Sequence, residues 1–446
     1  MRMRIEWAAL AVLALLANRA GAANVTFQVI YDFTIPGSLT GTPTYIVEVS
    51  PGMFMGTAAN GPEVFSITSD GTYNNIYVFP TIPSGFDVFG LAPALNNQVY
   101  GGGNASGTAP TVTELYSISR SGAITTYPYN PVTQGGPFNL VQHPDNHIYG
   151  FFATVVGAPA VFTRLDYLGN PTPLHTLSPD QGAPNLMFLG SNDDFFGLST
   201  LDGARSAGIF RMTTAGSFSW VTQSFAVSGY SLALIQASNG KFYGTLPQAG
   251  RAGAGSIYEA SLNGHMRTIY EFPRRTTGMP TSLIEASDGM LYGTTIGEDT
   301  HLLNNAVSTI FRLDPSSGNF QTLYSFAGRD CECSLVQGSD GRIYGISSSQ
   351  QLAGTFFVLD AGLAPPKPYV SYFAPAAGSA GQLVLLWGRN LLGATEVSFK
   401  GVRATTFDVP TTQGIWVEVP SGASTGPITV TTPNGSFVTS QTFTVE

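Results

Sequence analysis

The sequence predicts an all-β fold, and three observations support this prediction. The 446-residue chain contains 52 glycines and 12% aromatic residues but only 11% charged residues, which is typical of short strands joined by tight turns. Short apolar segments alternate with Asp-Gly, Asn-Gly and Ser-Gly turn signals. A segment such as "EASDGMLYGTT" (residues 285–295) recurs along the chain as "QASNGKFYGTL" (236–246) and "QGSDGRIYGIS" (337–347).

The first 22 residues are predicted to be a secretory signal peptide. Arg2 and Arg4 form a basic start, residues 7–17 are apolar, and Ala20-Gly21-Ala22 has the pattern of a cleavage site. The apolar run is shorter than the ~20 residues needed to span a bilayer. We therefore expect an exported protein without a membrane span, which is secreted, at the cell surface or in the periplasm.

Charge excludes one class of partner. The formal net charge is −9, and it becomes −11 once the signal peptide is removed. Nucleic-acid binding depends largely on basic contacts to phosphate groups. The sequence therefore predicts no nucleic-acid partner.

A repeat of about 48 residues organises most of the chain. Its anchor is an aromatic residue followed by glycine, found at Tyr100-Gly101, Tyr149-Gly150, Phe196-Gly197, Tyr243-Gly244, Tyr292-Gly293 and Tyr344-Gly345, with a degraded copy at Met55-Gly56. The glycines are 45, 49, 47, 47, 49 and 52 residues apart. This regular spacing predicts a structural unit that is copied seven times.

Each unit contains four strand-like runs, which are clearest in the sixth: "TSLIEAS", "MLYGTT", "STIFRLD" and "FQTLYSF". Asp288-Gly289 between the first two runs predicts a two-residue hairpin. Four short antiparallel strands per unit are typical of a propeller blade.

The two ends of the repeat region are complementary. The seventh unit lacks a fourth run, and "VTFQVIYDF" at residues 25–33 resembles the missing segment. Pairing these segments would protect two open strand edges. The sequence thus predicts a seven-bladed β-propeller over residues 23–363, closed by an N-terminal strand.

The repeat resembles the Gloeo/Verruco tandem repeat of exported bacterial proteins. The resemblance rests on "SDGxLYGTT"-like segments, "TIFRL" and "LYSF", is closest in the fifth to seventh units, and extends over residues 25–362. It implies an extracellular or surface role and names no ligand.

A second domain is predicted at residues 364–446, after the Pro-rich linker near 361–368. Five segments with period-two patterning predict a small immunoglobulin-like β-sandwich: 384–386, 397–399, 416–418, 428–432 and 443–445. "LWGRNLLGATEVSFKGVRA", "VEVPSGASTGPITVTTPNG" and the final "FTV" resemble the IPT/TIG family, with Leu391 where that family commonly has Phe. The resemblance implies a spacer or adhesive module.

A polar position recurs in the first strand of the units, seven residues before the anchor aromatic. It is occupied by Glu48, Pro93, Gln142, Leu189, Gln236, Glu285 and Gln337. In a propeller these residues lie near the axis. They are interpreted as hydrogen-bonding links between blades, with ligand contact, or a catalytic pair of Glu48 and Glu285, as alternatives.

Charged loops near the fifth to seventh units are the other candidate site. In the sixth unit Phe311 lies 18 positions after Gly293, against a separation of 14 in the fifth unit. Together with the flanking connections it contributes six candidate binding residues: Arg274, Arg275, Asp299, His301, Arg329 and Asp330. Loops on a rigid scaffold often carry function, although a solvated polar loop remains the simpler reading.

The sequence predicts no metal and no cofactor. His143 and His147 flank a predicted turn without further nearby ligands, and Cys331 and Cys333 have no second Cys/His pair to complete a zinc site. The two cysteines are interpreted as structural thiols, with a local disulfide or a metal pair as alternatives.

The leading functional hypothesis is an exported, monomeric, non-enzymatic binding protein whose partner is a glycan or another surface protein. A lyase or hydrolase that acts on polysaccharides in the propeller channel is the alternative. A purely structural role in a surface layer is a third.

Overall fold

The computed structural model describes these parts of the chain: residues 25–33, 39, 41–59, 63–79, 86–88, 90–105, 113–128, 136–153, 159–201, 206–226, 233–247, 249–251, 253–273, 279–296, 307–326, 334–347 and 354–446. The regular elements of the described residues are strands, apart from one short 3₁₀ turn at Pro179–Gln181. The predicted all-β class is therefore confirmed. The predicted signal peptide lies outside the described residues.

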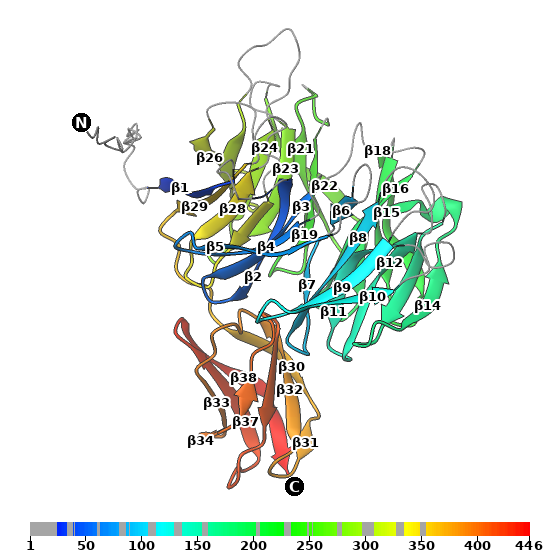
Figure 1. Cartoon of the computed structure of the whole chain (residues 1–446). Coiled ribbons are helices and arrows are strands. Elements are labelled where there is room, and N and C mark those ends of the chain that lie inside the picture. Colours follow the sequence, from blue (N-terminus) through cyan, green and yellow to red (C-terminus); the bar gives the residue numbers. More distant parts are fainter. Residues whose placement is uncertain are drawn as a thin grey trace, which may run out of the picture.

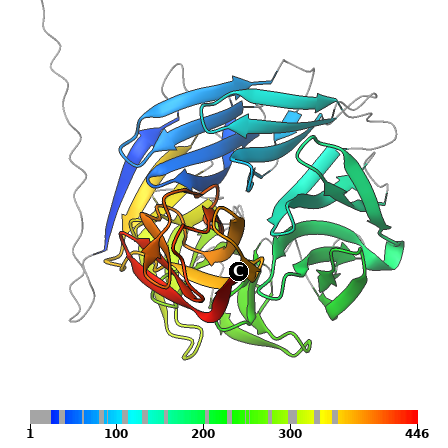
Figure 2. The same cartoon turned by 90° about the horizontal axis from the view of Figure 1, so that it is seen from below.

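Antiparallel sheets surround a central axis in a propeller-like ring (Figures 1 and 2). Sheet I contains β2 (Thr42–Ser50), β3 (Met53–Ala59), β4 (Glu63–Thr68) and β5 (Tyr73–Val78). Sheet II contains β6 (Phe86–Val88), β7 (Ala92–Pro93), β8 (Gln98–Ala105), β9 (Thr113–Ser119) and β10 (Ile124–Pro128). Sheet III contains β11 (Gly136–His143), β12 (His147–Ala153), β13 (Val161–Leu165) and β14 (Pro171–Thr176).

The ring continues with four further sheets. Sheet IV contains β15 (Ala183–Leu189), β16 (Phe195–Leu201), β17 (Ser206–Met212) and β18 (Phe218–Ala226). Sheet V contains β19 (Leu234–Gln236), β20 (Phe242–Leu246), β21 (Ser256–Ala260) and β22 (Met266–Glu271). Sheet VI contains β23 (Met279–Glu285), β24 (Leu291–Ile296), β25 (Thr309–Leu313) and β26 (Phe320–Ser325). Sheet VII contains β27 (Ser334–Gln337), β28 (Ile343–Ser347), β29 (Thr355–Asp360) and β1 (Thr26–Asp32).

The N-terminal strand completes sheet VII, as the sequence predicts. β1 pairs antiparallel with β29 from Thr26↔Asp360 to Asp32↔Thr355. Phe27 of β1 stacks on Tyr324 of sheet VI, with ring centroids 3.7 Å apart. The two ends of the repeat region are thus held together by a strand pair and by aromatic packing.

In sheet VI, the turn of the hairpin between the first strand (β23) and the second strand (β24) is one residue longer than predicted. Ala286 N donates to Met290 O and Gly289 N donates to Ala286 O, so three residues lie between the bonded Ala286 and Met290. A two-residue type I′ turn needs positive φ at both central residues. Here Gly289 alone has positive φ (75°), whereas Asp288 does not, which suits the three-residue form.

The turn residue Asp288 also explains why the repeat has a tyrosine four residues later. Its Oδ1 accepts the Met290 N–H at 3.1 Å, and its Oδ2 accepts the Tyr292 hydroxyl at 3.0 Å. Asp145 with Tyr149 and Asp340 with Tyr344 form the same bond across four residues. The Asp-x-x-x-Tyr spacing therefore satisfies a tyrosine hydroxyl at these three turns.

The anchor glycine provides space for an aromatic ring. Gly293 pairs with Phe311 of the third strand, and a Cβ at Gly293 would lie 2.5 Å from the Phe311 ring. Most of the other units repeat this pair, with corresponding distances of 2.2–2.5 Å, at Gly56–Phe65, Gly101–Tyr116, Gly197–Phe210, Gly244–Tyr258 and Gly345–Phe357. Any larger residue would displace the ring from the core.

Aromatic residues at the end of the fourth strand join sheet V to sheet VI and sheet VI to sheet VII. Tyr270 of sheet V stacks on Phe320 of sheet VI, with centroids 4.4 Å apart and planes at 8°. Phe272, two residues later, contacts Phe311 edge-on at 5.8 Å. Tyr324 and Phe326 make the corresponding contacts with Phe27 and Phe357 of sheet VII. The "LYSF" segment of the repeat is thus an inter-sheet contact.

The C-terminal residues form two further sheets, which pack face to face below the ring (Figure 1). One contains β30 (Tyr369–Ala374), β32 (Leu383–Arg389), β36 (Gly414–Glu418) and β35 (Phe407–Asp408). The other contains β31 (Ala377–Gly378), β38 (Gly435–Val445), β37 (Gly426–Thr432), β33 (Glu396–Phe399) and β34 (Val402–Arg403). Buried residues between them include Val384, Leu386, Leu391, Val397, Ile415 and Phe443.

These C-terminal sheets contact the turn end of the ring, the end that carries the hairpins between first and second strands. Leu95 of sheet II packs against Leu385 and Trp387, and the Trp416 indole N–H donates to Leu95 O at 3.2 Å. Asn434 donates to Ser339 O of sheet VII at 2.7 Å. Burying each large apolar side chain here contributes roughly 1.5–3 kcal/mol. The ring's opposite end, where second and third strands connect, is called the loop end.

Removing β1 tests whether strand pairing closes the ring. We expect a chain of residues 34–446 to be at least about 3 kcal/mol less stable than residues 23–446, because Phe27 and the β29 pairing partner are lost together. Urea unfolding followed by circular dichroism measures this difference. Equal unfolding midpoints for the two chains would contradict closure by β1.

Candidate functional site

Six of the predicted site residues lie outside the described residues: Arg274, Arg275, Asp299, His301, Arg329 and Asp330. Cys331 and Cys333 lie outside them as well. The strands that flank these segments are described, and they meet at the loop end of sheets V–VII. The remaining two predicted residues, Glu48 and Glu285, are described and are found at sheet boundaries.

Glu285 is a link from sheet VI to sheet V. Its two carboxylate oxygens accept the backbone N–H and the hydroxyl of Ser238, each at 2.7 Å. Glu48 links sheet I to sheet VII in the same way, accepting the Ser339 N–H at 2.8 Å and the Ser339 hydroxyl at 2.9 Å. Glu48 also accepts the Gly52 N–H of its own turn at 2.8 Å.

Glutamines make the equivalent link at other boundaries. Gln337 of sheet VII accepts the Ser287 N–H of sheet VI at 2.9 Å and donates to the Ser287 hydroxyl at 3.0 Å. Gln236 accepts the Ser191 N–H at 2.8 Å, and Gln142 accepts the Leu95 N–H at 3.2 Å. We call these five side chains the inter-sheet clamps: Glu48, Gln142, Gln236, Glu285 and Gln337.

The clamps correspond to the structural interpretation of the recurring polar position. Glu48 of sheet I is bonded to sheet VII, whereas Glu285 of sheet VI is bonded to sheet V. Neither carboxylate is bonded to the other among the described residues. The geometry therefore gives no support to a catalytic carboxylate pair.

Burial changes the acidity of one clamp. Desolvation of the buried Glu48 carboxyl raises its pKa, and the hydrogen bonds from Gly52 and Ser339 offset only part of this effect. Burying the ionised Glu48 carboxylate therefore costs folding free energy, and the neutral glutamine clamps avoid this cost.

His143 and His147 converge on one carboxylate. The Nδ1 atoms of the two rings lie 2.9 Å and 3.4 Å from Asp145 Oδ1. Burial acts to raise the pKa of Asp145, but bonds from His143 and Tyr149 outweigh it and hold that pKa at about 2. His143 Nε2 also lies 3.2 Å from Asp193 O of sheet IV. Within the described residues no group of three or more His, Cys, Asp or Glu could hold a metal ion.

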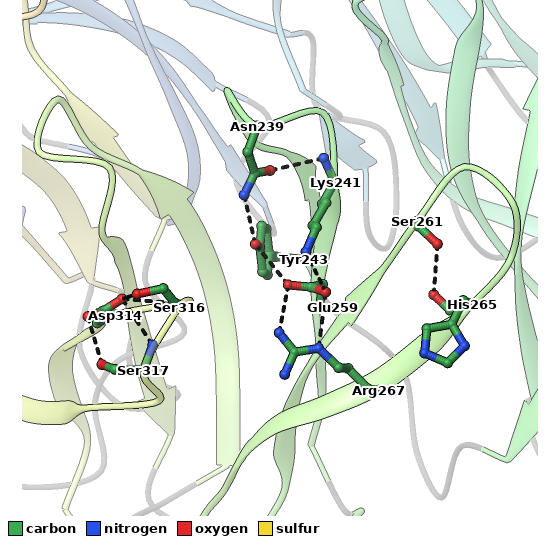
Figure 3. A network of polar contacts seen from close by, with 10 residues as sticks. All are labelled: Asn239, Lys241, Tyr243, Glu259, Ser261, His265, Arg267, Asp314, Ser316 and Ser317. Carbon is green, nitrogen blue, oxygen red and sulfur yellow. Dashed lines mark hydrogen bonds and ion pairs between the residues drawn. The ribbon is translucent and has the colours of Figure 1, made fainter.

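Sheet V contains a buried ionic network at its turn end (Figure 3). Glu259 is 8% exposed and accepts bonds from Lys241 Nζ at 2.9 Å and from Arg267 Nε and Nη2, both at 3.1 Å. The Tyr243 hydroxyl donates to the same carboxylate at 3.2 Å. Burial acts to raise the pKa of Glu259, but these three partners more than offset it, so the pKa is lowered.

Sheet VI has a pocket of about 580 Å³ at its turn end. It is lined by Asp288, Met290, Arg312, Asp314, Asn319, Phe320 and Gln321. Arg312 Nη2 donates to Gln321 Oε1 at 3.1 Å. The Ser316 and Ser317 hydroxyls donate to Asp314 at 2.6 and 2.7 Å and lower the pKa of this carboxyl (Figure 3).

The sequence-based predictions did not include the pocket residues. A comparison of equivalent repeat positions could have found them, because Lys241, Glu259 and Arg267 of sheet V are replaced by Met290, Arg312 and Gln321 in sheet VI. Leu95, Trp387 and Trp416, which hold the C-terminal sheets, were also missed. Their signal is weaker, because a lone tryptophan in a strand is usually a core residue.

The fold and these sites define an all-β repeat protein with a propeller-like ring. The chain belongs to the Gloeobacter/Verrucomicrobia repeat family, which matches residues 137–359 and again residues 229–421. No curated protein matches the chain. Among the described residues there is no helix with the length and hydropathy needed to cross a bilayer.

Solved structures share the architecture. Virginiamycin B lyase from Staphylococcus aureus is 15% identical, with a TM-score of 0.55 over 75% of this chain and 99% of the lyase. The extracellular domain of a putative hybrid two-component system from B. thetaiotaomicron is 10% identical, with a TM-score of 0.52 over 95% of this chain and 57% of that one. At such identities these similarities show the fold alone.

Substitutions of Glu285 test the clamp. Glu285→Ala leaves the Ser238 N–H and hydroxyl without their acceptor, so we expect a loss of about 1–3 kcal/mol in the free energy of unfolding. Glu285→Gln should cost less than about 1 kcal/mol, because Gln337 makes the equivalent bonds to Ser287. Urea unfolding at pH 7 measures both, with exposed Gln28→Ala as control. An alanine variant as stable as the control would exclude the clamp role.

The pH dependence of stability tests Glu48. A carboxyl whose pKa is raised by folding stabilises the fold fully below its unfolded pKa, and this contribution is lost as the pH rises through the folded value. We therefore expect the stability of the wild type relative to Glu48→Gln to fall as the pH increases from about 4 upward. Unfolding measured at a series of pH values shows this trend, and a constant difference would refute it.

Proposed function

We propose that the chain is an exported binding protein whose partner, a glycan or another surface protein, contacts the loop end of sheets V–VII. In this proposal the ring is a seven-bladed β-propeller over residues 23–363, residues 1–22 are a signal peptide, and residues 364–446 form an IPT/TIG-like immunoglobulin domain. The family membership and the sheet pairing support the first of these points.

The functional part of the proposal rests on where the strands that flank the charged segments begin and end. Met279, which follows the segment with Arg274 and Arg275, pairs with Ile296, which precedes the segment with Asp299 and His301. Thr309 pairs with Ser325, which precedes the segment with Arg329 and Asp330. Three charged segments of a charge-poor chain thus begin and end at the same edge of neighbouring sheets.

The opposite end of the ring is already occupied. The C-terminal sheets contact the turn end through Leu95 and Ser339, which belong to sheets II and VII. This contact supports a fixed orientation, with the loop end directed away from the C-terminal sheets. A rigid scaffold that presents connecting segments at one end is a common arrangement for binding.

A binding screen with loop-end variants tests the proposal. Residues 23–446 are applied to a glycan array and cross-linked to isolated cell envelopes, which report glycan and protein partners respectively. We expect Arg274→Ala/Arg275→Ala to weaken binding by about 10-fold, equivalent to about 1.4 kcal/mol. Arg403→Ala, which removes an exposed charge from a C-terminal strand, should leave binding unchanged.

Two results would contradict this function. One is binding that is insensitive to the loop-end variants while the fold is intact. The other is hydrolysis or elimination of a polysaccharide that is abolished by Glu285→Gln or Glu48→Gln, which would establish an enzyme that uses the axial carboxylates.

A further inference from the structure

We propose that the pocket of sheet VI binds a neutral sugar residue, and that it is a second site separate from the loop end. The pocket lies between the hairpin that contains Asp288 and the turn at residues 314–319, at the turn end of the ring. None of its lining residues belongs to the C-terminal sheets. Its volume of about 580 Å³ falls within the usual range of small-ligand sites, roughly 300–1,000 Å³.

The lining chemistry matches a polyhydroxylated ligand. Met290 and Phe320 offer apolar surface for the C–H face of a sugar ring. Arg312 contributes N–H donors, Asp288 and Asp314 contribute acceptors, and the Asn319 and Gln321 amides contribute both. Such planar polar groups beside an apolar platform can bond neighbouring hydroxyls while the ring lies on the platform.

The charges favour a neutral ligand. The Arg312 guanidinium shares the pocket with two carboxylates, Asp288 and Asp314, so no positive surplus remains for an acidic sugar. A cationic ligand would have to approach the guanidinium itself. Both carboxylates are also held by partners of their own, Tyr292 for Asp288 and the two serine hydroxyls for Asp314. They can still accept bonds from sugar hydroxyls through their remaining lone pairs.

In sheet V, the position equivalent to this pocket is occupied by side chains of the protein itself. Tyr243, Glu259 and Arg267 are paired across three strands, as Tyr292, Arg312 and Gln321 are in sheet VI. In sheet V, Lys241 and Arg267 extend over Glu259 and close the position with ionic bonds. In sheet VI, Arg312 donates to the Gln321 amide instead of a carboxylate and lines a pocket that remains open.

This difference provides a test that should preserve the fold. The triple variant Met290→Lys/Arg312→Glu/Gln321→Arg transfers the ionic network of sheet V into sheet VI. Wild-type residues 23–446 and the variant are screened on an array of neutral oligosaccharides of glucose, galactose, mannose and N-acetylglucosamine. Hits are then titrated by calorimetry. Circular dichroism and urea unfolding show that the variant is folded.

We expect the triple variant to lose at least about 10-fold in affinity for a neutral oligosaccharide. The single variant Gln321→Ala should bind more weakly than the wild type. Thr125→Ala, at the position equivalent to Gln321 in sheet II, is the matched control and should bind as the wild type does. Arg274→Ala/Arg275→Ala should also leave this binding unchanged, which separates the pocket from the loop end.

Two outcomes would overturn the proposal. The first is neutral-sugar binding that the folded triple variant retains at full strength. The second is a wild-type protein that binds no neutral oligosaccharide on the array or at millimolar concentration in solution. Neither outcome depends on whether the loop end binds a partner.

Discussion

The packing of each sheet against its neighbour is the constraint on which the rest of this structure depends. A four-stranded sheet has two apolar faces, and both must be covered by another sheet because an exposed face would cost the hydrophobic stabilisation. Two repeated devices meet this need. The aromatic pair at the end of the fourth strand, such as Tyr270 and Phe272, packs on the fourth and third strands of the next sheet. The inter-sheet clamps, such as Glu285 with Ser238, satisfy backbone groups near the axis.

This constraint limits where chemistry can occur. The axial carboxylates are bound to backbone N–H groups and serine hydroxyls, so their hydrogen-bonding capacity serves the ring. The side chains at the turn end of the second to fourth strands can differ more between sheets, because most of them lie beyond the aromatic contacts that join neighbouring sheets. Sheet V uses these positions for the Glu259 network and sheet VI leaves them as a pocket. Repeats with the same strand order thus differ at a few side chains at this end of the sheet.

The C-terminal sheets add a second constraint. Trp387 and Trp416 pack around Leu95, and a Cβ at Gly414 would lie 2.3 Å from Leu95 Cδ2. Leu95 N is in turn held by the Gln142 clamp. The turn that receives the C-terminal sheets is therefore fixed by the ring itself, and any movement between the two parts would have to break apolar packing and hydrogen bonds together.

The sequence by itself determined the all-β class, the repeat and the pairing of the first segment with the last, because period, turn residues and strand patterning are local properties. It also indicated that the polar position of Glu285 links neighbouring sheets. Only the tertiary structure decided which serine each clamp reaches, that the Asp288 hairpin is a three-residue turn, and where Leu95 meets Trp416. The clamp and Leu95 contacts join residues 47–321 positions apart in the chain, and no local pattern specifies them. The turn at Asp288 is local, but an Asp-Gly pair is compatible with both two-residue and three-residue hairpins. The pocket beside Arg312 has the same origin, because it exists only where three strands place side chains of different length on one surface.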